Sequence, residues 1–129
     1  MDEAAGILDA LWTRHDGRRR NPFNEIECGD HYARALAGWS VLRALTGVDY
    51  DASTGTLTVA PVRALLTPVD GALVLPIVIG DAWGSLRVTP EHLEIDLRAG
   101  SLEFRGLRVD DRALDLTVVA TAGEPVRLE

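Results

Sequence analysis

The sequence contains no lysine, and its charge is far from balanced. All thirteen of its basic residues are arginines, against twenty Asp and Glu, so the formal net charge at pH 7 is −7. An acidic chain repels the phosphate backbone of nucleic acids. The one tight basic run, Arg18, Arg19 and Arg20, is too short to reverse that repulsion. We therefore expect no nucleic-acid partner.

Cysteine and long apolar runs are also scarce. The single cysteine, Cys28, cannot form an internal disulfide, which excludes a disulfide-stapled secreted scaffold. The first residues are acidic and lack the basic region and long apolar stretch of a signal peptide. The longest apolar stretch, residues 72–79, is interrupted by Pro76 and is too short to cross a membrane. We expect a soluble, cytoplasmic protein with no transmembrane segment.

The first 47 residues carry the signals of helices. Four apolar residues recur at i, i+1, i+4 and i+5, which predicts an amphipathic helix over residues 3–14. The Asn21–Pro22 pair ends any helix, because proline disfavours the helical conformation in the residue before it. The four apolar residues are Ile7, Leu8, Leu11 and Trp12.

A second helix is predicted from Gly29 or Asp30 to about Thr46, with Gly47 as its stop. This helix is apolar nearly all round, which is typical of a helix buried on most sides. A chain of 129 residues has little with which to bury it. Its main apolar stripe consists of Tyr32, Leu36, Trp39, Leu42 and Leu45.

From residue 48 onward apolar and polar residues alternate, which predicts short strands. Gly, Asp and Ser cluster at the breaks in this alternation and indicate turns. We expect an antiparallel β meander or a small sandwich with one solvated face. The fold class is therefore α+β, with a helical segment at 1–47 and a β-rich region at 48–129. The predicted turns are Ser53-Thr54-Gly55, Arg98-Ala99-Gly100, Asp110-Asp111-Arg112 and Ala122-Gly123-Glu124-Pro125.

The residues with chemical potential are concentrated between positions 18 and 34. Glu25 and Glu27 lie two apart, so an extended segment would direct both carboxylates to one side, as general acid–base chemistry requires. The alternative is that they accept hydrogen bonds from loop amides or pair with arginines. Arg34 lies in an otherwise apolar helix, where a guanidinium needs a partner, either a glutamate of this loop or a ligand hydroxyl.

Cys28 and His31 suggest a thiol–imidazole pair or two metal ligands. A structural zinc site needs about four ligands, and the only other histidines are His15 and His92. We therefore expect no metal and no cofactor, and interpret Cys28 as a small buried residue.

Tryptophan is the last residue type with a possible role. Trp12, Trp39 and Trp83 would suit a platform for stacking sugar rings, but such residues more often belong to a core, and we expect a core role. The Trp83–Gly84 pair is expected to form a tight bend between two strands.

Residues 20–35, Arg-Asn-Pro-Phe-Asn-Glu-Ile-Glu-Cys-Gly-Asp-His-Tyr-Ala-Arg-Ala, closely resemble a motif near the C-terminus of glycoside hydrolase family 116. This family contains β-glucosidases, β-xylosidases and the non-lysosomal glucosylceramidase, also called bile acid β-glucosidase. The resemblance extends over roughly residues 5–88 and includes Gly80-Asp81-Ala82-Trp83-Gly84-Ser85. It implies a retaining glycosidase with an (α/α)6 barrel, whose last part the two predicted helices would form.

The resemblance also implies roles for individual residues. Glu25 and Arg34 match positions that hydrogen-bond hydroxyls of the bound glucosyl unit, while Glu27, Asp30 and His31 would shape the loop and the start of the helix. The family's nucleophile and general acid/base lie on segments upstream of this motif. A retaining glycosidase needs both carboxylates, about 5–5.5 Å apart, so we expect these 129 residues alone to be inactive.

The implied partners are a glucoside-type substrate and a missing N-terminal glycosidase chain. The alternative is a free-standing β-rich interaction module without catalytic activity. A third interpretation is a thiol or metal enzyme centred on Cys28 and His31.

Overall fold

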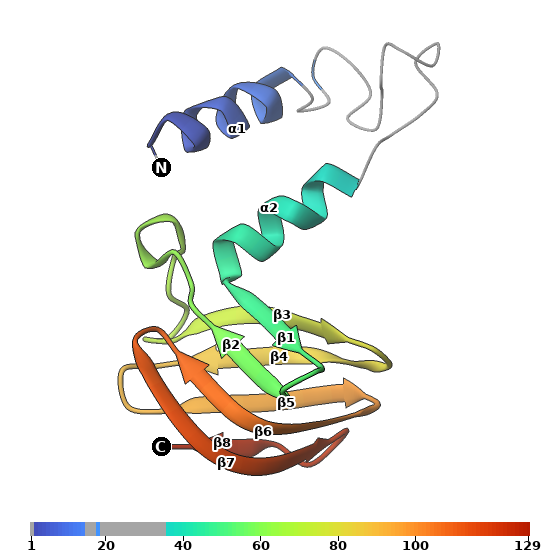
Figure 1. Cartoon of the computed structure of the whole chain (residues 1–129). Helices are drawn as coiled ribbons and strands as arrows, with labels where there is room; N and C mark the ends of the chain where they lie inside the picture. Colours follow the sequence, from blue (N-terminus) through green and yellow to red (C-terminus); the bar gives the residue numbers. More distant parts are fainter. Residues whose placement is uncertain (1, 15–17, 19–35) are drawn as a thin grey trace. The chain divides into compact units, whose positions relative to one another are not determined.

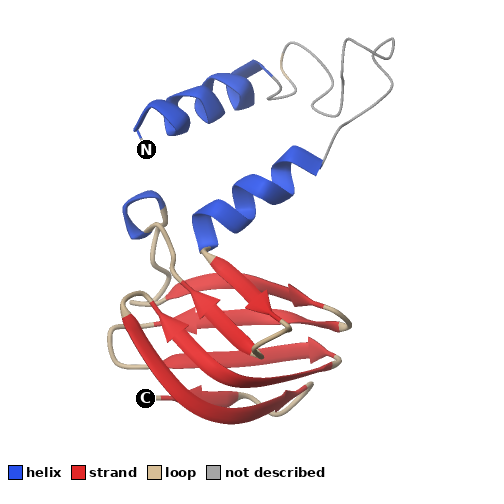
Figure 2. Ribbon diagram, viewed as in Figure 1, coloured by secondary structure: helices blue, strands red, loops and turns tan. Residues whose placement is uncertain are grey.

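The computed structural model describes residues 2–14, 18 and 36–129 (Figure 1). The chain divides into two compact units, residues 1–39 and 40–129. In the described residues two helices come first and strands follow, as the sequence predicts (Figure 2). The α+β class and the mostly antiparallel character of the strand region are thereby confirmed.

The two helices are α1 (Asp2–Arg14) and α2 (Leu36–Thr46). α1 agrees with the predicted helix within one residue at its start. The predicted beginning of the second helix, at Gly29 or Asp30, lies outside the described residues. Its predicted end is confirmed: Gly47 takes a positive φ of 58°, and its N–H donates to the carbonyl of Arg43 at 2.8 Å. This is the left-handed stop that glycine adopts without steric cost.

The strands form two four-stranded sheets that lie one behind the other (Figure 1). One sheet has the order β1 (Val48–Asp51), β2 (Thr56–Val59), β6 (Ser101–Val109), β7 (Arg112–Thr121). The other has the order β3 (Leu73–Ile79), β4 (Ala82–Val88), β5 (Leu93–Ala99), β8 (Val126–Leu128). The second sheet is antiparallel throughout, whereas β2 and β6 in the first run parallel.

The two sheets enclose one hydrophobic core. Alternate residues of their strands point inward, as the period-two pattern of the sequence predicts, and the resulting cluster draws on both sheets. Phe104 of β6 and Leu86 and Ile95 of the opposite sheet are completely buried. The small-sandwich alternative is therefore the one that the structure adopts.

The predicted turns lie where the sequence places them. Gly55, Gly100 and Gly123 all have positive φ, and Asp110 reaches a φ of 50° in the tight turn between β6 and β7. A non-glycine residue tolerates this region best when it is Asp or Asn.

The expectation of a bend at Trp83–Gly84 is wrong. Both residues lie inside β4, and the turn occurs earlier, at Gly80 and Asp81. Gly84 is needed for another reason: a Cβ there would lie 2.1 Å from the carbonyl oxygen of Asp96. Glycine thus permits a close approach of β4 and β5, next to the irregularity in their register.

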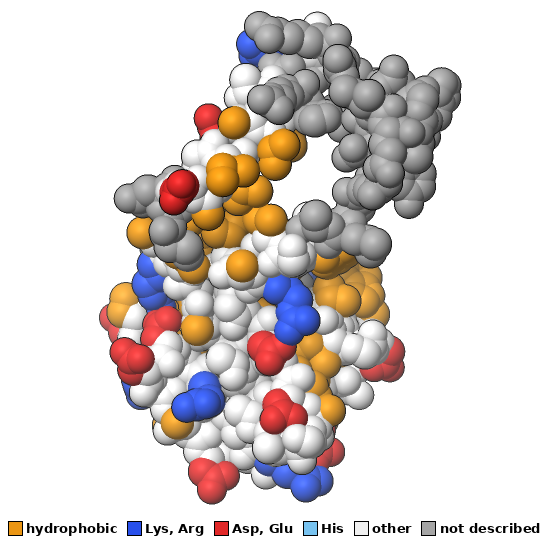
Figure 3. Space-filling view, turned by 45° about the horizontal axis from the view of Figure 1, so that its top comes forward, with side chains coloured by type: hydrophobic (Ala, Val, Ile, Leu, Met, Phe, Trp, Pro, Cys, Tyr) orange, Lys and Arg blue, Asp and Glu red, His pale blue; other side chains and the backbone are white. Residues whose placement is uncertain are grey.

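Within the sandwich, the expectation that tryptophan forms core is also wrong, because Trp83 is exposed. Trp12 of α1, Trp39 of α2 and Trp83 of β4 are 74%, 54% and 53% exposed. Hydrophobic side chains are visible on the molecular surface in Figure 3. Residue type alone does not tell on which side of an element a tryptophan lies, and Trp83 is on the outward face of its strand.

Candidate functional site

The residues that the sequence singles out for chemistry belong to the segment between the two helices. Glu25, Glu27, Asp30, His31 and Arg34 all lie outside the described residues, and so does Cys28. The candidate site within the described part of the chain is a different one.

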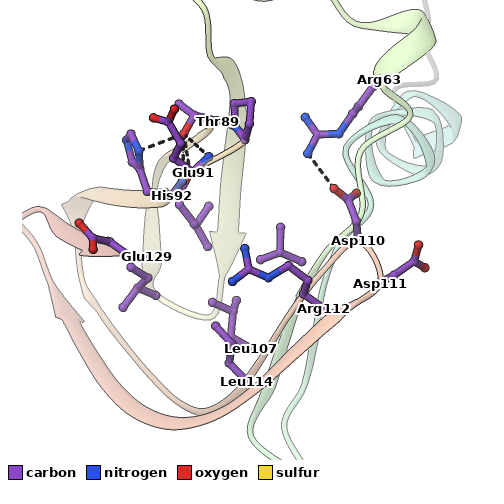
Figure 4. Close-up of a pocket in the computed structure, with 14 residues that line it drawn as sticks. Arg63, Thr89, Glu91, His92, Leu107, Asp110, Asp111, Arg112, Leu114 and Glu129 are labelled. Carbon is purple, nitrogen blue, oxygen red and sulfur yellow. Dashed lines mark hydrogen bonds and ion pairs between the residues drawn. The ribbon is translucent and has the colours of Figure 1, made fainter.

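That site is a cleft at one end of the sandwich, with a volume of about 320 Å³ (Figure 4). Its walls come from the turn between β4 and β5, the turn between β6 and β7, the 3-10 turn η2 (Arg63–Leu65) and the end of β8. The floor is apolar, with Leu107 and Leu114 on one sheet and Leu93 and Leu128 on the other. The cleft therefore opens onto the edge of the hydrophobic core.

Charged side chains surround this apolar floor. The guanidinium of Arg63 donates to the carboxylate of Asp110 at 2.7 Å, which joins η2 to the β6–β7 turn. Arg112, at the start of β7, forms no ion pair with any residue that the structure describes. Glu91 and Glu129 contribute further carboxylates to the cleft lining (Figure 4). The rim thus presents both signs of charge above an apolar base.

Thr89 and His92 form the most extensively hydrogen-bonded polar group among the residues that line the cleft. The Thr89 hydroxyl oxygen accepts the backbone N–H groups of Glu91 at 3.2 Å and of His92 at 3.0 Å. It also lies 2.9 Å from Nδ1 of His92. Hydrogen bonds of this kind, from a threonine hydroxyl to the backbone two and three residues later, stabilise a turn. His92 is therefore held in place as part of the β4–β5 turn. Among the described residues, Thr89 is the one nucleophilic side chain that is hydrogen-bonded to the His92 ring.

The cleft combines an apolar floor with a rim of charged side chains, an arrangement that can hold a small ligand. Asp110 is engaged by Arg63, so it is not free to act as a base. Within residues 2–14, 18 and 36–129, no cluster of three His, Cys, Asp or Glu side chains could hold a metal ion. No pattern in the sequence indicates this cleft, because its residues come from separate turns and from the end of the chain.

One carboxylate with a shifted pKa lies away from the cleft, in the hairpin between β1 and β2. The hydroxyl of Ser53 donates to Oδ1 of Asp51 at 2.6 Å, and the Ser53 backbone N–H donates to the same oxygen at 2.9 Å. These hydrogen bonds stabilise the carboxylate and lower the pKa of Asp51 from its ordinary value of 3.8. Because the group is fully exposed and closes a tight turn, its role is structural.

No protein-family model matches the sequence, and no curated protein matches it significantly. Among the helices in the described ranges, neither has the length and apolar character needed to span a bilayer.

Proposed function

We propose that the chain is the C-terminal part of a retaining β-glucosidase or glucosylceramidase-like glycoside hydrolase. The observation that carries this proposal is the sixteen-residue resemblance of residues 20–35 to the motif of glycoside hydrolase family 116. A resemblance of that length, which includes paired glutamates, a cysteine and a histidine, is far more specific than a short signature. Residues 1–47 would contribute to the end of an (α/α)6 barrel, with residues 48–129 as a β-rich appendage.

The surface of the helices supports the proposal. Ile7, Leu8 and Trp12 of α1 are all exposed, and so is Trp39 of α2. Exposed apolar side chains at helical spacing are typical of helices whose natural packing partners belong to another segment. In a complete (α/α)6 barrel, neighbouring helices would cover such side chains.

In the proposed enzyme, this chain binds the sugar and does not perform the proton transfer. The Glu25 carboxylate accepts hydrogen bonds from glucosyl hydroxyls, and the Arg34 guanidinium donates to hydroxyl oxygens. Bonds with one charged partner are about twice as strong as neutral ones. The nucleophile and the general acid/base belong to other segments, which must bring two carboxylates to about 5–5.5 Å across the scissile bond.

The first test is the size of the protein in its source cells. An antibody raised against residues 1–129 should detect a band many times larger than 14.0 kDa. Material isolated with this antibody should hydrolyse an aryl β-glucoside. A band at 14.0 kDa, with no glucosidase activity in the isolated material, would overturn the proposal.

The second test addresses the binding residues in the complete protein. Glu25→Gln and Arg34→Lys should each lower kcat/KM for an aryl β-glucoside by about 10- to 100-fold, the loss expected for a charge-assisted hydrogen bond. Glu3→Gln, at an exposed position of α1, is the matched control and should leave kcat/KM unchanged.

A second candidate function is a free-standing β-rich interaction module. The observation that favours it is the closed core of the sandwich, in which Phe104, Leu57 and Ile95 are completely buried without help from another chain. This module predicts cooperative unfolding of the isolated chain and no binding of a hydrophobic dye. The glycosidase proposal predicts strong dye binding, because the helices then lack their partners.

A further inference from the structure

The cleft at the end of the sandwich has an apolar floor to which both sheets contribute. Leu107 and Leu114 belong to β6 and β7, and Leu93 and Leu128 belong to β5 and β8. Leu114 and Leu128 are only partly buried, so the floor still exposes apolar surface to water. An apolar group that enters the cleft would cover this surface, which favours binding in proportion to the area covered.

The charges on the walls leave one guanidinium available to a ligand. Arg63 is engaged by Asp110 at 2.7 Å, whereas Arg112 forms no ion pair with any residue that the structure describes. Figure 4 shows the Arg112 side chain extending from the start of β7 into the cleft, above Leu107 and Leu114. A negatively charged group held over the floor would therefore meet a guanidinium that is not already paired.

The carboxylates of the lining do not compete for this guanidinium. Figure 4 shows the side chains of Asp111 and Glu129 directed away from Arg112, and that of Glu91 directed away from the floor. They therefore do not point into the space over the leucines. A ligand in that space would meet apolar side chains below it and the positive charge of Arg112 beside it.

We propose that this cleft binds a small monocarboxylate with an apolar alkyl or aryl body. The apolar body covers the leucine floor, and the carboxylate oxygens accept hydrogen bonds from the Arg112 guanidinium, whose planar fork matches them. The cleft volume of about 320 Å³ is at the lower end for ligand pockets, so the ligand is small. This binding goes beyond the proposed glycosidase function, since residues 63–129 line the cleft and the helical segment does not.

A single guanidinium also favours a carboxylate over a phosphate. A carboxylate carries one negative charge, whereas a phosphate monoester carries about 1.5 to 2 at pH 7. Among the described residues that line the cleft, no arginine other than Arg112 lacks an ion-pair partner. The available positive charge therefore compensates a carboxylate and leaves part of the charge of a phosphate uncompensated.

Ligands that share one alkyl chain and differ in their head group test the proposal. Octanoate, octanol and octylamine are titrated into the 129-residue chain, and its backbone amide resonances are followed by NMR. Octanoate should bind at least about threefold more tightly than octanol or octylamine, because it alone pairs with the guanidinium. The amide resonances of Arg112 and Leu114 should shift on binding.

A shorter carboxylate tests the role of the floor. Butanoate has the same head group as octanoate and a chain shorter by four CH2 groups. Each buried CH2 group strengthens binding about fourfold, so burial of even two of them gives more than tenfold. Butanoate should therefore bind at least about tenfold more weakly than octanoate.

Arg112→Gln isolates the contribution of the guanidinium. It should weaken octanoate binding by about three- to tenfold and leave octanol binding unchanged, because only the carboxylate pairs with the guanidinium. Arg112 is exposed, so the substitution does not disturb the core. The matched control is Arg108→Gln, which removes the same charge from an exposed residue of β6 outside the cleft lining. The control should leave the binding of both ligands unchanged.

Several results would overturn the proposal. Equal affinities for octanoate and octanol, or no saturable binding of octanoate, would show that the cleft does not recognise a carboxylate. Resonance shifts confined to α1 and α2 would assign binding to the exposed apolar side chains of the helices. Equal losses in Arg112→Gln and Arg108→Gln would mean that octanoate responds only to the net charge of the chain. Tighter binding of octyl phosphate than of octanoate would contradict the assignment of a carboxylate.

Discussion

Gly47 joins α2 to β1, and we expect its replacement by alanine to destabilise the folded chain strongly. Its φ of 58° is one that other residues rarely adopt. A Cβ built on its backbone would lie 2.0 Å from the carbonyl oxygen of Ala60 and 2.4 Å from the carbonyl carbon. Gly47→Ala therefore combines backbone strain with a collision against the chain that leaves β2.

The magnitude follows from these two effects. The left-handed conformation costs a residue with a Cβ about 1–2 kcal/mol. To relieve the collision, the two segments must separate to ordinary contact distance, at least 3.4 Å. That movement breaks the bond from Ala60 N–H to the Gly47 carbonyl, now 3.2 Å, and strains the 2.8 Å bond from Val62 N–H to the Leu45 carbonyl. Each bond contributes about 1 kcal/mol, so we expect a total loss of about 3 kcal/mol or more.

Gly80→Ala is the matched control. Gly80 has nearly the same φ, 61°, but no atom lies within 4 Å of the Cβ it would acquire. Its loss should be limited to backbone strain, about 1–2 kcal/mol. Urea unfolding followed by circular dichroism measures both free energies of unfolding. Equal losses in the two variants, within about 0.5 kcal/mol, would refute the reasoning, because the collision would then contribute nothing.

Three further predictions concern the core, the cleft and pH. Phe104→Ala should lower the free energy of unfolding by about 3–5 kcal/mol. Trp83→Ala should lower it by about half as much or less, because the Trp83 side chain is 53% exposed. Chemical denaturation of the two variants measures both losses. Arg63→Ala removes an exposed ion pair with Asp110 and should cost about 1 kcal/mol or less, a loss that disappears in about 1 M salt. Asp51→Asn should lower the free energy of unfolding above pH 3.8, because the folded state holds the pKa of Asp51 below that value. The difference in the free energy of unfolding between the variant and the natural protein should shrink as the pH falls below 3.8. Measurements of stability over a series of acid pH values check this.

Local features of the strand region could be read from the sequence because each depends on near neighbours. Alternation marked Leu57, Val59 and Ile95 as inward-facing, and all three are completely buried. The change of phase between Phe104 and Leu107 is also visible in the sequence, and the structure has an irregularity in the β6–β7 register there. Turn residues were equally predictable, since glycine and aspartate supply the positive φ that these turns need.

The candidate sites were less predictable. Glu25 and Arg34 were found by resemblance to a family motif, and spacing alone left several interpretations of them open. The cleft could not be found from the sequence, because Arg63, His92 and Arg112 are ordinary turn and strand-end residues until the fold gathers them.

The sequence by itself determined the order of helices and strands, the inward positions of most strands and the places where the chain turns. These depend on a period of two or 3.6 residues and on the φ that each residue tolerates. Only the tertiary structure decided the division into two sheets, the parallel pairing of β2 with β6, the exposure of Trp83 and the open edge at β7. The physical reason is that an alternating strand specifies which of its faces is apolar but not which strand lies beside it. That choice depends on the combined packing of segments far apart in the chain.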